Sequence, residues 1–64
     1  MGRQKRFEVV VDAWNGSRGK CFRKIFFCLN IAGARTKAEA YLDELMDAYS
    51  YDEWEIAGIE ELFD

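Results

Sequence analysis

The chain has 64 residues, of which 50% are hydrophobic and 16% aromatic, and its formal net charge at pH 7 is −3. This length suits one small domain spanning residues 1–64, and the composition is that of a folding chain, not a disordered one. Because the chain has no histidine and its two cysteines cannot complete a tetrahedral zinc site, we expect neither a metal nor another cofactor.

The first predicted element is a strand over residues 7–14. One side of it carries Phe7, Val9, Val11 and Ala13, and the other carries Glu8, Val10, Asp12 and Trp14. The three consecutive valines favour β structure because their branched side chains are stiff. Residues 15–19, Asn-Gly-Ser-Arg-Gly, then indicate a hairpin turn, since Asn and Gly tolerate positive φ.

A second strand is predicted over residues 20–31, which include both cysteines. Seven residues of extended chain separate Cys21 from Cys28 by roughly 23 Å, at about 3.3 Å per residue. A disulfide needs Cα atoms less than about 7 Å apart, so we expect two free thiols. Free thiols favour a reducing compartment, and no signal peptide or membrane-spanning segment is visible, so we expect a cytoplasmic location.

The next predicted element is an amphipathic helix that ends near Tyr49. Gly33 is expected to break the second strand, and Thr36 and Glu39 match a capping box that starts the helix. The apolar positions follow the helical period at Ala38, Tyr41, Leu42, Leu45, Met46 and Tyr49. A third strand is predicted over 53–59. The order β-β-α-β predicts an α+β fold, with a three-stranded antiparallel sheet in the order 2-1-3 and one helix packed on one face.

The uncovered face of this sheet is a candidate dimer interface. If Val9, Val11, Ile25, Phe27 and Leu29 face the helix, the opposite face carries Val10, Trp14, Phe22, Phe26 and Cys28. One helix cannot cover both faces, and an exposed apolar patch usually marks an interface. One hypothesis is a homodimer through Val10, Trp14, Phe22 and Phe26. The alternative is that the C-terminal tail, with Leu62 and Phe63, folds over these side chains.

Charge is divided sharply along the chain. All nine Lys and Arg residues lie within residues 1–37, and ten of the twelve acids lie within residues 38–64. On a helical wheel, the acids of the helix lie opposite its apolar stripe, where like-charge neighbours cost roughly 0.2–0.5 kcal/mol per pair. The sequence therefore predicts either a solvated face or an anionic surface for a basic partner. The residues of this candidate surface are Glu39, Asp43, Glu44, Asp47, Asp52, Glu53 and Glu55.

The basic end of the chain offers a second candidate surface. Arg18, Lys20, Arg23 and Lys24 surround the predicted hairpin, and Phe22 and Trp14 are close in the sequence. Cations interleaved with aromatic rings can bind nucleic acid through phosphate contacts and stacking. The simpler interpretation is an edge strand protected from aggregation by its charges.

No catalytic constellation accompanies these charges. Without histidine, neither a serine nor a cysteine has a plausible triad partner, so we expect a protein that is not an enzyme. The size, the β-β-α-β order and the helix sequence Thr36-Lys37-Ala38-Glu39-Ala40 resemble small phage-encoded inhibitors, including anti-CRISPR proteins. The resemblance implies a protein that binds a host defence complex, such as a CRISPR effector or another nucleic-acid-binding complex, often by covering its nucleic-acid site. A nucleic-acid-binding or regulatory module that uses the basic hairpin is the alternative.

Overall fold

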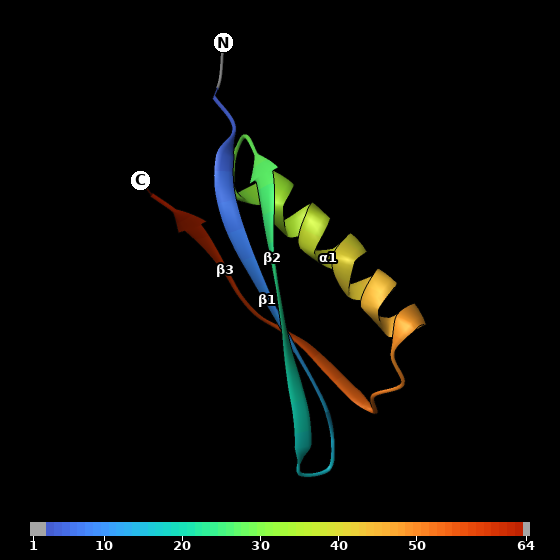
Figure 1. Ribbon diagram of the computed structural model, residues 1–64. Coiled ribbons are helices and arrows are strands. Elements are labelled where there is room, and N and C mark those ends of the chain that lie inside the picture. The colour runs from blue at the N-terminus through green and yellow to red at the C-terminus, as the bar shows by residue number, and fades with distance from the viewer. Residues whose placement is uncertain (1–2, 64) are drawn as a thin grey trace.

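The computed structural model describes residues 3–63, which form a twisted sheet with a helix along one side (Figure 1). The elements are β1 (Lys5–Asn15), β2 (Arg18–Cys28), α1 (Ile31–Ala48) and β3 (Glu53–Leu62). The sheet is antiparallel with the order β2-β1-β3. The predicted ββαβ fold and its strand order are thus confirmed.

The β1–β2 hairpin closes through two residues, Gly16 and Ser17, and not through the five predicted. Gly16 has a φ of 58°, the conformation that the first turn position of a type II′ hairpin requires and that glycine adopts without strain. Asn15 therefore pairs with Arg18, and further along the ladder Val11 pairs with Phe22. Paired residues point to the same face of a sheet, so this register decides which side chains of β2 meet the helix.

The third strand pairs with the other edge of β1 and is longer than predicted, because it continues to Leu62. Its register shifts beside Val10 and Val11, which pair with Gly58 and Ile56. Ala57 is the extra residue of this β-bulge. The bulge lets Ile56 and Ile59 both face the helix, although they are three residues apart.

The helix begins six residues earlier than predicted, because its N-cap is not Thr36. Asn30 is the N-cap, and its side-chain oxygen accepts a hydrogen bond of 3.0 Å from the Gly33 N–H. The predicted capping box was wrong because Asn30, among the strongest N-cap residues, lies only two residues after the end of β2 at Cys28. Gly33 consequently lies within the first turn of the helix and does not break a strand. Thr36 is inside the helix, where its hydroxyl donates to the Ala32 carbonyl at 3.2 Å.

The hydrophobic core lies between the helix and one face of the sheet. Its fully buried strand residues are on β1, where Phe7 is 1% exposed and Val9, Val11 and Ala13 are 0% exposed. The helix contributes Ala34, Ala38 and Leu45, and small alanines allow it to lie close to the sheet. Tyr41 and Leu42 also pack against this core as predicted, whereas Met46 and Tyr49 are 49% and 41% exposed. Near the C-terminal end of α1, the core is closed by aromatic rings around Phe22. The Phe22 ring stacks on the Trp54 ring, with 6.0 Å between the two centroids.

Candidate interaction surfaces

The outer face of α1 carries the predicted row of carboxylates. Glu39, Asp43, Glu44 and Asp47 are all exposed, because the apolar stripe on the other side of the helix packs on the sheet. The last turn of the helix holds no basic residue. Within residues 3–63, the ion pairs Lys5–Glu61 and Arg23–Glu8 lie on the sheet, and none involves a carboxylate of the helix. This outer face is therefore a negative surface whose charges are not neutralised within the described chain.

The structure does not bring the remaining predicted acids onto that surface. Glu53 and Glu55 pair with Trp14 and Asp12 of β1 and point away from the helix. Asp52 is exposed in the loop before β3, where its backbone N–H donates to Asn15 Oδ1 at 2.6 Å. The predicted acidic site is thus two surfaces, one on the helix and one across the sheet from it.

The sheet face opposite α1, hereafter the open face, differs from the predicted dimer face. Val10 and Trp14 are on it as expected, and both are partly buried. Phe22 and Phe26 are not: Phe22 is 8% exposed in the helix-side core, and the Phe26 ring lies 5.8 Å from the Tyr41 ring of the helix. The register of β2 instead places on the open face Ile25 and Phe27, which are 47% and 53% exposed.

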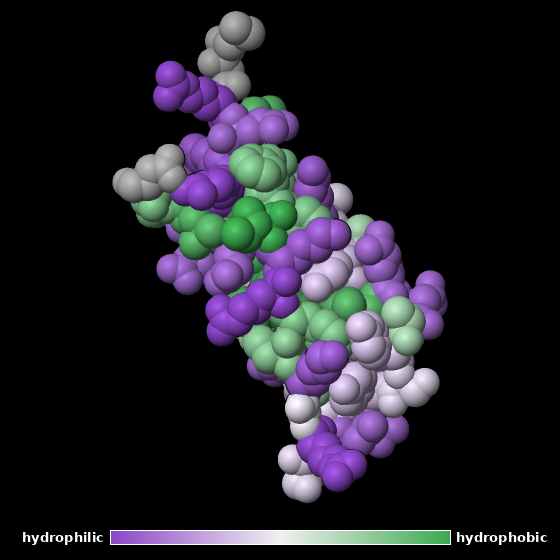
Figure 2. Space-filling view, in the orientation of Figure 1, coloured by the Kyte–Doolittle hydropathy of each residue, from purple (hydrophilic) through white to green (hydrophobic). Residues whose placement is uncertain are grey.

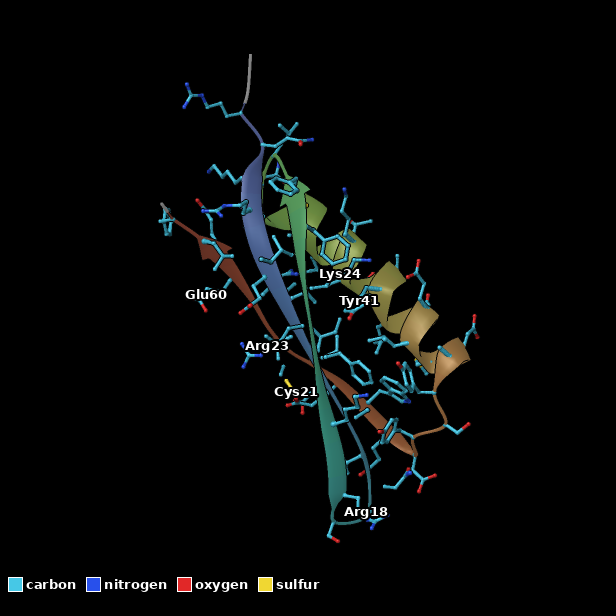
Figure 3. The ribbon with its side chains drawn as sticks, viewed as in Figure 1. Arg18, Cys21, Arg23, Lys24, Tyr41 and Glu60 are labelled. Carbon is cyan, nitrogen blue, oxygen red and sulfur yellow. The ribbon has the colours of Figure 1, made fainter. Side chains whose placement is uncertain are left out.

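Beside the predicted Glu55, the open face carries Glu8, Asp12 and Glu60, which the predicted acidic site did not include. Glu8 of β1 lies directly opposite Glu60 of β3, and Asp12 lies directly opposite Glu55. Like charges in such cross-strand pairs are destabilising. Arg23 of β2 compensates in part, since its Nη1 lies 3.2 Å from Glu8 Oε1. In Figure 3, Arg23, Cys21 and Glu60 all point away from the helix, on the side of the sheet that α1 leaves uncovered.

The four predicted nucleic-acid-binding cations do not form one surface. Lys20 and Lys24 lie on the helix side of β2 and Arg23 lies on the open face, while Arg18 stands at the hairpin turn (Figure 3). The Lys24 ammonium is 5.3 Å from the centroids of Phe26 and Tyr41, and Lys20 is 5.1 and 5.2 Å from those of Phe22 and Tyr49. Such distances are typical of cation–π contacts. These two lysines therefore cover the aromatic rings between β2 and the helix.

The pKa of the Tyr41 phenol lies above its ordinary value. Burial raises the pKa of the Tyr41 phenol, because it disfavours the phenolate, and the nearby Tyr49 and the Glu44 carboxylate raise it further. The phenol is thus a neutral component of the seam between the helix and β2.

One hollow of the described surface opens between the hairpin and the segment that follows α1. It has a volume of about 590 Å³ and lies at the hairpin end of the sheet, lined by Asn15, Arg18, Gly19, Tyr49, Ser50 and Tyr51. Asn15 joins its two sides, since its side chain also donates to the Ser50 carbonyl at 3.5 Å. Among residues 3–63 no group of three or more potential metal ligands is found, and no helix is long and apolar enough to cross a membrane.

Comparison with protein-family models, with curated proteins and with solved structures finds no match to the chain. The function proposed below is therefore argued from the geometry of the surfaces alone.

Proposed function

We propose that this chain is a non-enzymatic, protein-binding inhibitor, in the manner of phage-encoded anti-CRISPR proteins. Its acidic helix face occupies a basic surface that a host defence complex uses to bind nucleic acid. The observation that carries the proposal is the row of exposed carboxylates Glu39, Asp43, Glu44 and Asp47, which have no ion-pair partner within the described chain.

The spacing of these carboxylates suits a site built for a phosphate backbone. Residues four apart on a helix are separated by about 6 Å along its axis, as are Glu39 and Asp43, and Asp43 and Asp47. Alternate phosphates of one DNA strand are about 6.8 Å apart. A groove lined by Lys and Arg at phosphate spacing therefore meets a comparable series of negative charges on this helix.

The energetics of the helix also favour a binding role over simple solubility. The pairs Glu39–Asp43 and Asp43–Asp47 each cost roughly 0.2–0.5 kcal/mol. Asp47 lies in the last turn, where the helix dipole disfavours a negative charge. A solvated face that mixed the signs of its charges would avoid these costs. Binding to a cationic partner offsets them, and the same field speeds association at low salt.

The test is capture of a partner from a host-cell extract by the tagged protein, followed by elution with duplex DNA. We expect a captured protein that DNA releases, and we expect the double variant Asp43→Lys/Asp47→Lys to fold normally and to lose capture. The matched control Ala40→Lys/Ala48→Lys adds positive charge to exposed helix positions without removing a carboxylate, and should retain most of the binding. Undiminished capture by the Asp43/Asp47 variant would contradict the proposal.

The alternative function, direct nucleic-acid binding, is favoured by one observation. Lys20 and Lys24 stand on the same side of β2, each above two aromatic rings. A gel-shift assay with labelled DNA and RNA separates the two functions. Binding at physiological salt that is lost in Lys20→Ala/Lys24→Ala supports the alternative, whereas the main proposal predicts no shift.

A further inference from the structure

We propose that the open face of the sheet binds a basic amphipathic helix of another protein, which packs along the strands as a second covering layer. This site is separate from the outer face of α1, because the sheet lies between the two. The inference does not depend on the proposed function, and its test uses a different ligand.

The open face lacks the covering layer that α1 provides on the other side of the sheet. On β2 it presents Ile25 and Phe27, which are 47% and 53% exposed, and Val10 is beside them on β1. Figure 2 shows hydrophobic side chains gathered over the upper half of the molecule, interleaved with hydrophilic ones. Apolar side chains exposed together on one face of a small domain commonly mark an interaction site.

Carboxylates predominate on this face. They lie directly opposite one another in the pairs Glu8–Glu60 and Asp12–Glu55, and like charges in such cross-strand pairs are destabilising. The Arg23 guanidinium lies next to Glu8 and Arg6 is also on this face, but with Glu53 the face has five carboxylates and two cations. The occupant that relieves this repulsion carries Arg or Lys side chains.

The same acids argue against a second copy of this chain as the occupant. A twofold axis that crosses the strands between two stacked sheets places β1 against β1, as does one that runs along β1. Glu8 and Asp12 on this central strand would then meet the same carboxylates of the other copy. Burying carboxylates without cationic partners is strongly unfavourable, because the charges lose their hydration. The homodimer hypothesis for this face is therefore disfavoured.

The apolar side chains and the carboxylates of the open face lie on different strands. Apolar side chains concentrate on β2, and carboxylates concentrate on β3. A helix laid along the strands can place an apolar stripe over Ile25 and Phe27 and a cationic flank over Glu55 and Glu60. The 11 residues of β1 extend about 36 Å at 3.3 Å per residue, which accommodates a helix of more than five turns at about 5.4 Å per turn.

The experiment measures binding of a fluorescent synthetic peptide by anisotropy, in buffer of about 0.1 M ionic strength. The peptide is a helix of about five turns with a leucine stripe and arginines along one flank. Two protein variants of equal charge are compared: Glu55→Lys/Glu60→Lys on the open face and Asp43→Lys/Asp47→Lys on the helix. We expect the open-face pair to raise Kd by about tenfold, or 1.4 kcal/mol, and the helix pair to raise it by less than about threefold.

Two further measurements separate the apolar and the self-association components. Phe27→Ser should weaken binding of the peptide, and a peptide with glutamate in place of arginine should not bind. Equal losses in the two charge-reversed variants, or no binding of the arginine peptide, would overturn the inference. So would a dimer in sedimentation equilibrium of the protein alone that Phe27→Ser dissociates, since a second copy would then be the occupant. Because the helix variant keeps its peptide affinity here but loses partner capture, the two proposals fail separately.

Discussion

The two faces of the sheet are formed by the same three strands, but they differ in burial and in charge. On the helix side, β1 presents Phe7, Val9, Val11 and Ala13, all at most 1% exposed. On the open face the alternate residues of the same strand include Glu8 and Asp12, each opposite another carboxylate. One strand thus contributes its odd residues to the core and its even residues to a charged surface.

This difference shows where the chain is optimised for stability and where it is not. A domain of this length buries only about 60% of its unfolded surface and is stable by a small margin. It nevertheless retains opposed carboxylates on the open face and like-charge pairs along α1. Selection for stability alone would replace them, which supports the binding roles proposed above.

The largest effect is expected from Phe7→Ala on the covered face. Truncating a buried phenylalanine costs about 3–5 kcal/mol, which is comparable to the whole stability of a small domain, so the variant should be largely unfolded by circular dichroism. Its matched control is Phe27→Ala on the open face, where the ring is 53% exposed; there we expect a loss of less than about 1 kcal/mol in urea unfolding. Similar losses in the two variants would remove the contrast between the faces.

The start of the helix is tested by Asn30→Ala. Loss of the hydrogen bond from the Gly33 N–H should lower the free energy of unfolding by about 1 kcal/mol, as for other N-cap substitutions. Thr36→Ala, at the N-cap that the sequence predicted, should change stability by less than about 0.5 kcal/mol, because this residue is within the helix. The opposite order of the two effects in urea unfolding would place the N-cap at Thr36.

The cost of the open-face acids is tested by Glu55→Lys. The substitution replaces repulsion from Asp12 with attraction and should raise the free energy of unfolding by about 0.2–1 kcal/mol. The gain should shrink in high salt, which screens exposed charges. A salt-independent loss of stability would show that Glu55 stabilises the fold, contrary to this prediction.

The smallest effect concerns Tyr41 and alkaline pH. Because the folded state raises the pKa of this phenol above its ordinary 10.0, the unfolded state loses the proton first. Stability is therefore unaffected below about pH 10 and falls as the pH rises through the folded-state pKa. Tyr41→Phe should show a smaller drop in urea midpoint between about pH 9 and pH 11 than the parent chain. Equal drops in the two proteins would mean that Tyr41 does not contribute to the alkaline loss.

The sequence was sufficient for the fold because β1 and α1 each have a clear hydrophobic period. The alternation of β1 and the 3.6-residue spacing of α1 predicted both elements and their buried sides. The strand β2 lacks such a signal, since Phe22 and Phe26 have one parity and Ile25 and Phe27 have the other. Its orientation depends entirely on the length of the hairpin turn.

The turn explains why the dimer face was assigned incorrectly. A five-residue turn over 15–19 pairs Val11 with Arg23 and places Ile25 on the helix side. The observed two-residue turn pairs Val11 with Phe22, a slip of one residue that exchanges the two faces of β2. A two-residue turn with glycine at its first position is among the commonest hairpin connections, and counting back from it would have placed Ile25 and Phe27 on the open face.

The division of the predicted acidic site into two surfaces could not be predicted from the sequence, for a different reason. The charges of β3 are adjacent in the chain to those of the helix, but strand pairing with β1 turns Glu53 and Glu55 to the opposite side. The bulge at Ala57 then keeps Ile56 and Ile59 on the helix side. No local sequence pattern predicts this bulge. Only the structure therefore shows on which face of the sheet Glu60 lies.

The most direct test of the central claim, that the open face is the binding face of the sheet, is NMR mapping of the arginine–leucine peptide on the isotopically labelled protein. We predict that amide shifts concentrate on the alternate residues Glu8, Val10 and Asp12 and on their neighbours Phe27 and Glu60, while the exposed face of α1 moves little. Shifts centred on Glu39, Asp43 and Asp47 with an unperturbed sheet would contradict the account, since the helix would then be the only acidic surface that binds a cationic partner.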